Sequence, residues 1–132
     1  MSDLNDLVPT SDTIVVELKH PNTGKTLDND DGSPMTITVM APHTREYKAL
    51  IYKQANERIQ KSGGVMPEYT YEELDEASTT LLSSATIDWN ITFNGEKPKF
   101  SAKKAKEIYE KVFWIKPQVE EAIASYTAFT KV

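Results

Sequence analysis

The chain of 132 residues contains no cysteine. This absence excludes disulfide bonds, thiolate zinc sites, iron–sulfur clusters and cysteine nucleophiles, and it suits a reducing compartment such as the cytosol. Long hydrophobic runs are also lacking, since nowhere do about 18 apolar residues follow one another as a membrane span requires. Residues 1–10 include Asp3 and Asp6 and no long apolar run. We therefore expect neither a signal peptide nor a membrane partner.

Positive charge is in the minority. The sequence has 15 lysine and arginine residues against 20 aspartate and glutamate residues, which gives a formal net charge of -5. A field of this sign repels phosphate, and the chain lacks the basic footprint that nucleic-acid-binding domains show. We therefore expect no nucleic-acid partner.

Motifs for catalysis and for cofactor binding are absent as well. The two histidines, His20 and His43, each lie beside a proline and have no partner at metal-ligand spacing. An acidic turn at residues 28–32 looks like the start of an EF-hand loop, but Ser33 and Val39 stand where that loop needs glycine and glutamate. No phosphate-binding loop and no nucleophile elbow occurs. The sequence predicts that the protein is not an enzyme and takes no metal or cofactor.

The composition is that of one globular domain spanning the whole chain, with 39% hydrophobic and 27% charged residues. Residues 13–19 and 35–40 alternate apolar and polar side chains with the period of two that is typical of half-buried strands. Turn-forming residues separate these stretches and could flank a very short strand at residues 25–27. We expect residues 1–12 to be flexible and residues 13–41 to form a small antiparallel β-hairpin or meander.

Beyond residue 42 the apolar period changes to about 3.6, which predicts a helical part over residues 42–132. The first helix has His43 or Thr44 as its cap and ends near residues 62–64, where glycines can take left-handed dihedrals. Its apolar stripe consists of Tyr47, Leu50, Ile51, Ala55 and Ile59.

A second helix begins with a capping box, in which the Thr70 hydroxyl accepts from the amide of Glu73 while the Glu73 side chain reaches back. We extend this helix to about Asp88. Residues 87–93 nevertheless alternate as strands do, so whether this stretch ends the helix or forms a strand stays open. The predicted buried stripe of the helix consists of Tyr71, Leu74, Ser78, Leu81, Leu82 and Ala85.

Ser101 caps a third helix in the sequence pattern. Because Pro117 is tolerated in the first turn of a helix but not in its interior, we expect a break at residues 114–116. A fourth helix then follows, whose apolar residues are Val119, Ala122, Ile123, Tyr126 and Phe129. The predicted fold class is α+β, mainly helical with about four helices and a small N-terminal sheet.

Opposite charges gather on the second and third helices. Residues 68–88 contain six acidic side chains and no basic one, whereas residues 97–116 contain seven lysines against two glutamates. Either the two helices pack together and their charges offset one another within the molecule, or the acidic face of one copy meets the basic face of another in a ring or open spiral. The candidate interface residues of the second account are Glu72, Glu76, Lys103 and Lys106.

Aromatic residues are few, and two of them adjoin the predicted break between the third and fourth helices. Phe113 and Trp114 follow one another there, so both can hardly point into the same core. One of them is therefore a candidate anchor at an interface.

A series of features follows in order along nearly the whole chain: the strand Thr13 to Pro21, Gly24, Asp31 to Met35, Asp88-Trp89-Asn90, Asn94-Gly95, Phe100-Ser101 with Ala105, Trp114-Ile115, Gln118-Val119 and Phe129. Their order and spacing resemble the tail assembly chaperones of long-tailed, siphovirus-type bacteriophages. This resemblance implies a small protein of the host bacterial cytoplasm that is absent from the mature virion.

The resemblance further implies partners. Such a chaperone coats the tape-measure protein, self-associates, and recruits tail-tube subunits, and a longer form can arise by programmed frameshifting. The family has no catalytic residues that could be carried over. The alternative is a small virion structural or adaptor protein of the tail-tube or head-completion type, a class that usually depends on larger β-sheets.

Overall fold

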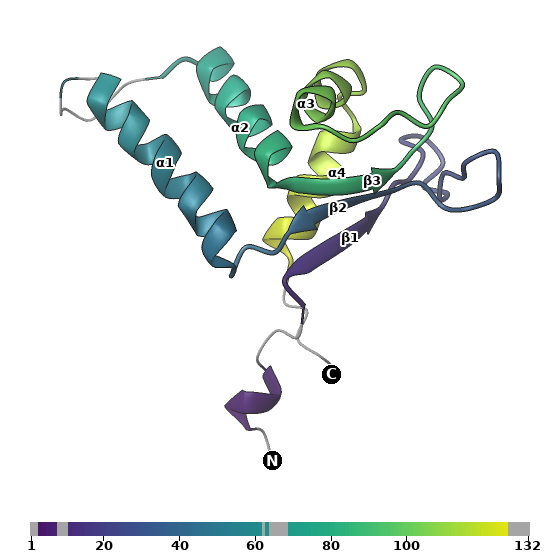
Figure 1. Ribbon diagram of the computed structural model, residues 1–132, viewed down its shortest axis with the longest axis horizontal. Coiled ribbons are helices and arrows are strands. Elements are labelled where there is room, and N and C mark those ends of the chain that lie inside the picture. The colour runs from purple at the N-terminus through teal and green to yellow at the C-terminus, as the bar shows by residue number, and fades with distance from the viewer. Residues whose placement is uncertain (1–2, 8–10, 62, 64–68, 127–132) are drawn as a thin grey trace.

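The computed structural model describes residues 3–7, 11–61, 63 and 69–126. The described part contains four α-helices and one three-stranded antiparallel sheet, which confirms the predicted α+β class (Figure 1). In chain order the elements are the 3-10 helix η1 (Leu4–Leu7), β1 (Thr13–Glu17), β2 (Thr36–Met40), α1 (Arg45–Lys61), α2 (Tyr71–Ala85), β3 (Thr86–Asn90), α3 (Ala102–Lys111) and α4 (Ile115–Ala124).

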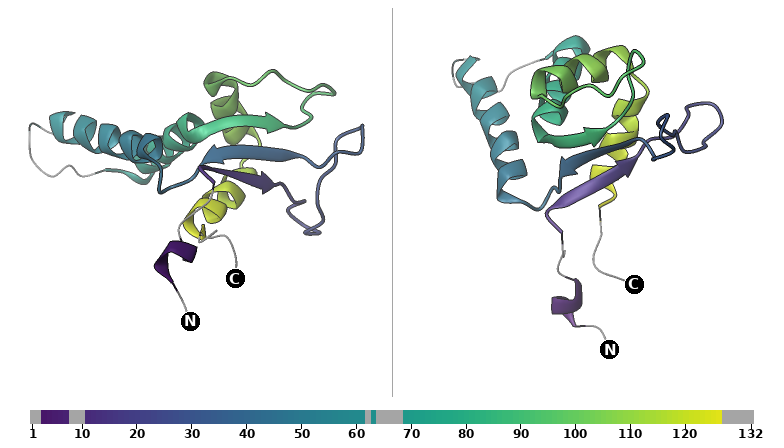
Figure 2. Two further views of the ribbon diagram at one scale, coloured as in Figure 1. Left: turned by 60° about the horizontal axis from the view of Figure 1, so that its bottom comes forward. Right: turned by 45° about the vertical axis from the view of Figure 1, so that its right-hand side comes forward.

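The strands lie in the order β1-β2-β3, so β2 is in the centre. Val16 pairs with Ile37, and Ile37 pairs with Trp89. Because side chains alternate between the two faces of a sheet, these three residues share one face, and Figure 2 (left) shows α4 on one side of the sheet. Val15 lies on the opposite face and is 60% exposed. The sheet is therefore buried on one face and open on the other.

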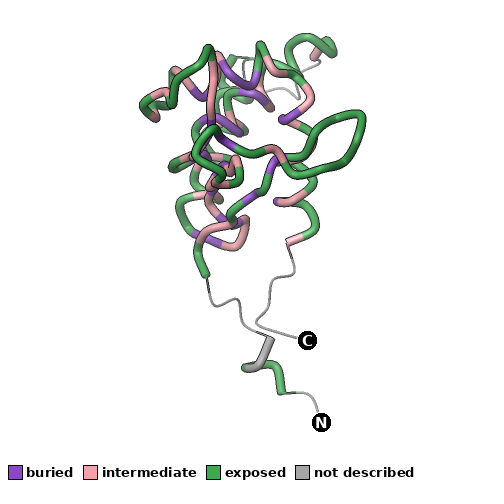
Figure 3. Tube along the Cα trace, turned by 90° about the vertical axis from the view of Figure 1, so that its right-hand side faces the viewer, coloured by how far each residue is buried: buried purple, intermediate pink, exposed green. Residues whose placement is uncertain are grey.

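One hydrophobic core lies between the buried face of the sheet and the helices α2, α3 and α4. Gln118 attaches α4 to the chain beyond β1, because its side-chain amide accepts from the Lys19 N–H at 2.9 Å and donates to the Lys19 carbonyl at 2.8 Å. Figure 3 marks buried residues in purple. The buried residues of the core cluster are Val16, Leu18, Ile37, Val39, Leu82, Ile91, Ala105, Ile108, Tyr109, Ile115, Val119 and Ile123.

Helix α1 lies outside this core, and none of its residues is buried. The apolar stripe of the sequence pattern is largely uncovered, since Ile51 and Ile59 are 41% and 49% exposed. Tyr47, in its first turn, packs against the core and is half-buried. In the described part of the chain, α1 packs principally against α2, at one edge of the molecule (Figure 1). Periodicity shows that one face of a helix is apolar, but it does not show that a neighbour covers that face.

The second helix ends at Ala85, so its predicted extension to Asp88 is wrong. The alternating stretch is a strand over Thr86–Asn90, and the sheet is therefore not confined to the N-terminal region 13–41. The central strand explains this outcome. Ile37 of β2 is fully buried, and a central strand has backbone groups on both edges that need partners. Strand β3 supplies the second row of these partners.

Local signals at the helix starts are confirmed. The hydroxyls of Thr44, Thr70 and Ser101 each accept a hydrogen bond from the backbone N–H three residues later, at 3.0 to 3.1 Å. The capping box at Thr70 is complete, and Pro117 lies in the first turn of α4. The very short strand considered at residues 25–27 does not form, and Thr26 makes an isolated β-bridge with Lys19 instead. Phe129, expected on the fourth helix, lies outside the described residues.

The loop between β1 and β2 is held by one buried asparagine. Asn29 is 3% exposed, and its amide donates to the Asn90 carbonyl at 3.2 Å and accepts from the Thr92 hydroxyl at 2.6 Å. Nearby, Lys97 pairs with Asp31 at 2.7 Å, which holds the pKa of Asp31 well below its usual range. These contacts join the loop to the segment that follows β3.

A buried hydroxyl pair links the end of α2 to α3. The Thr86 and Tyr109 hydroxyl oxygens are 2.8 Å apart, and Thr86 donates its own proton to the Leu82 carbonyl. Tyr109 is therefore the donor in the pair. Burial raises the pKa of Tyr109 to about 12, because the phenolate form would lose its hydration.

This raised pKa predicts a pH-dependent loss of stability. An unfolded tyrosine ionises near pH 10, whereas Tyr109 in the folded protein stays neutral to about pH 12, so its contribution is full below pH 10 and is lost as pH rises through 12. We expect Tyr109→Phe to lower the free energy of unfolding by about 1 kcal/mol at pH 8, through the lost hydrogen bond. At pH 11 the difference in the free energy of unfolding between Tyr109→Phe and the wild type should shrink or reverse.

The measurement is urea unfolding of both proteins at pH 8 and pH 11. Tyr71→Phe, at a side chain that is 91% exposed, is the matched control and should follow the wild type. An equal deficit of Tyr109→Phe at both pH values would contradict the prediction.

Candidate protein-binding surface

The acidic second helix and the basic third helix pack against each other in the structure. The Lys106 ammonium lies 2.5 Å from the Glu76 carboxylate, and this hydrogen bond raises the pKa of Lys106. Lys116, at the start of α4, lies 2.7 Å from the Asp75 carboxylate. These charges thus offset one another within one molecule. The head-to-tail contact between copies stays a prediction, because a single chain does not test it.

The other two charged candidates are not brought together. Glu72 and Lys103 take part in no ion pair within the described residues, and both are exposed. The pKa of Glu107 is lowered mainly by Lys104, whose ammonium lies 2.9 Å from the Glu107 carboxylate. Lys103 contributes a small part of this shift through its charge. Glu72 lines a groove between α1 and α2.

The two aromatic residues at the break between α3 and α4 differ in burial. Phe113 is 74% exposed. Trp114 is half-buried, packs against the core and lies at the N-terminus of α4. The expectation that both cannot enter the core is therefore confirmed, and Phe113 is the residue left on the surface.

Two further apolar side chains are exposed on α2, within four residues of Asp75, which pairs with Lys116. Tyr71 and Leu74, in the first turns of α2, are 91% and 43% exposed. The ion pair between Asp75 and Lys116 holds this end of α2 against the start of α4, three residues after Phe113. We call Tyr71, Leu74 and Phe113 the corner patch. The prediction that Tyr71 and Leu74 are buried is wrong, because the core meets α2 through its later turns, at Thr79, Leu82, Ser83 and Ala85.

The described residues offer no cluster of three or more histidine, cysteine or carboxylate side chains that could hold a metal ion. Within that same part of the chain, every helix is too short or too polar to cross a membrane. The acidic turn at residues 28–32 has an interaction of its own, the ion pair of Asp31 with Lys97. The exposed features described above are the apolar side chains of the corner patch and the charged side chains of α2 and α3.

Comparison with protein-family models, with curated proteins and with solved structures finds no match to this chain.

Because Phe113 and Trp114 differ in burial, we expect their replacement by alanine to change the free energy of unfolding by different amounts. We expect Phe113→Ala to change the free energy of unfolding by less than about 0.5 kcal/mol, since the exposed ring has little contact to lose. We expect Trp114→Ala to lower it by about 2 kcal/mol, because its packing against the core would be lost. Urea unfolding at neutral pH measures both values. Equal destabilisation by the two variants would show that Phe113 also belongs to the core.

Proposed function

We propose that this chain is a bacteriophage tail assembly chaperone, which binds the tape-measure protein, self-associates and recruits tail-tube subunits in the host bacterial cytoplasm. The order of features from Thr13 to Phe129 resembles that family, as described above. The observation that carries the proposal is the corner patch, because Phe113 and Tyr71 expose large aromatic side chains three residues before Lys116 and four residues before Asp75, which form an ion pair.

Such a patch suits the binding of a long helical protein. An amphipathic helix presents apolar side chains at spacings of three, four and seven residues, and it docks where apolar anchors lie on a firm surface. Phe113 is held at a corner between two helices, and Leu74 and Tyr71 lie on one face of α2 because they are three residues apart. Aromatic anchors of this kind carry much of the energy of protein contacts.

The proposal predicts that Phe113 is needed for partner binding and not for folding. The test is co-expression with the tape-measure protein, followed by capture through a tag on this chain. We expect Phe113→Ala to reduce capture about tenfold or more, because a central aromatic anchor contributes about 2 kcal/mol. Its melting temperature should equal that of the wild type.

The control is Val15→Thr, at a side chain that is 60% exposed on the open face of the sheet. This variant keeps the branched shape and should bind fully. Full capture by Phe113→Ala would remove the corner patch from the binding surface. Failure of the wild type to capture the tape-measure protein would count against the proposed function itself.

A further inference from the structure

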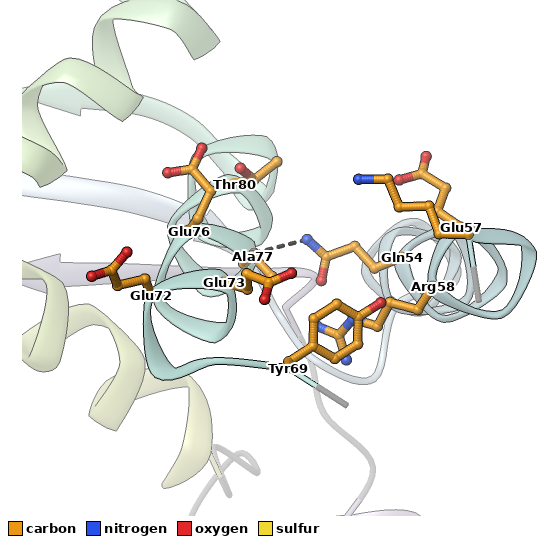
Figure 4. A pocket seen from close by; sticks show the side chains of 10 residues that line it. Gln54, Glu57, Arg58, Tyr69, Glu72, Glu73, Glu76, Ala77 and Thr80 are labelled. Atoms are coloured by element: carbon orange, nitrogen blue, oxygen red, sulfur yellow. Dashed lines mark hydrogen bonds between the residues drawn. The ribbon is translucent and has the colours of Figure 1, made fainter. Parts of the chain in front are cut away.

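A groove of about 580 Å³ runs between α1 and α2 (Figure 4). Its lining residues recur every three or four positions on each helix, so one face of α1 and one face of α2 form its walls. Those residues are Gln54, Glu57, Arg58 and Lys61 from α1, and Glu72, Glu73, Glu76, Ala77 and Thr80 from α2, with Tyr69 just before α2.

The walls of the groove are linked by two contacts. The Gln54 side chain donates to the Ala77 carbonyl at 2.8 Å, and the Arg58 guanidinium lies 5.3 Å from the centre of the Tyr69 ring. Figure 4 shows Gln54 reaching from α1 toward α2 and the Tyr69 ring beside Arg58. The groove is thus part of the fold, formed because α1 packs on α2 without entering the core.

Negative charge is in excess along the groove, with four glutamates against Arg58 and Lys61. Two of these glutamates have partners: Glu73 completes the capping box, and Glu76 pairs with Lys106. Glu57 and Glu72, on opposite walls, take part in no ion pair within the described residues, and both are exposed. The groove thus carries charges of both signs with an excess of negative charge, which favours ligands of positive charge.

We infer that this groove binds a helical protein segment that carries lysine or arginine side chains. Such side chains place their ammonium or guanidinium groups at the carboxylates of Glu57 and Glu72 and lay their aliphatic stems along Ala77 and the Tyr69 ring. A purely apolar helix would instead bury these carboxylates without partners. The inference deepens the proposed function and rests on it, because it names the kind of segment that the chaperone holds beside the corner patch.

The test uses the full chain and a fluorescein-labelled helical peptide of alanine and lysine, with an alanine–glutamate peptide for comparison. Fluorescence anisotropy at low salt gives the Kd. We expect binding of the lysine peptide alone, and a Kd about five times higher for Glu57→Gln/Glu72→Gln. Salt at 1 M should weaken binding by the wild type, since the Debye length then falls to about 3 Å.

The control variant Glu17→Gln/Glu121→Gln loses the same two charges from exposed positions outside the groove and should bind like the wild type. Equal weakening by both double variants would overturn the inference, because the peptide would then respond to net charge alone. Equal binding of the two peptides, or no binding of the lysine peptide, would also overturn it.

The outcomes for the groove and for the proposed function are separable. Loss of lysine-peptide binding in the groove variant, with folding intact by melting temperature, supports the groove even if the wild type fails to capture the tape-measure protein. Capture of the tape-measure protein that depends on Phe113 and not on Glu57 and Glu72 would reject the groove and leave the proposed function standing.

Discussion

The structure depends on one constraint, which is that a sheet of three five-residue strands cannot stand alone in water. Its stability requires a hydrophobic layer on one face. Here that layer comes from α3, α4 and the later turns of α2, which bury Ile37 and Val39 of the central strand completely. Helix α1 contributes no buried residue, and it reaches this core through the half-buried Tyr47.

The two ends of α2 differ in burial, and this difference follows from the same constraint. Its last turns enter the core through Leu82 and Ala85, whereas its first turns project beyond the core and carry Tyr71 and Glu72 at the surface. The Asp75 pair with Lys116 holds this projecting end in place. One helix therefore joins a rigid core to the corner patch and to one wall of the groove.

The sequence allowed the elements to be predicted where the signal is local. The caps at Thr70 and Ser101 and the presence of a break before Pro117 depend on contacts within a few residues, so the pattern alone identifies them. The break itself lies at residues 112–114, slightly before the predicted residues 114–116. The stretch after Ala85 could not be assigned to helix or strand, because its strand pairing is with β2, 47 to 54 residues earlier in the chain. That pairing is a tertiary effect which periodicity does not contain.

The candidate surface was predictable in part. Phe113 and Trp114 could be recognised as a pair of which one stays outside the core, but the choice between them depends on how α3 turns into α4. The separation of charges between the second and third helices likewise left open whether they pair within one molecule or between copies. In the structure α2 packs on α3, and Lys106 pairs with Glu76 of the same molecule. Tyr71 was assigned to the core because the apolar stripe of α2 continues through it, although the core ends before it. Nothing in the pattern marks where a core stops.

Amide hydrogen exchange tests most directly the claim that α1 and the first turns of α2 are kept outside the core for a partner. In the chain alone, α1 amides should exchange faster than those of β2. In the co-expressed complex with the tape-measure protein, protection should increase in α1, in the first turns of α2 and around Phe113, with β1 and β2 unchanged. Protection gained on the sheet alone, with α1 unaffected, would contradict the account.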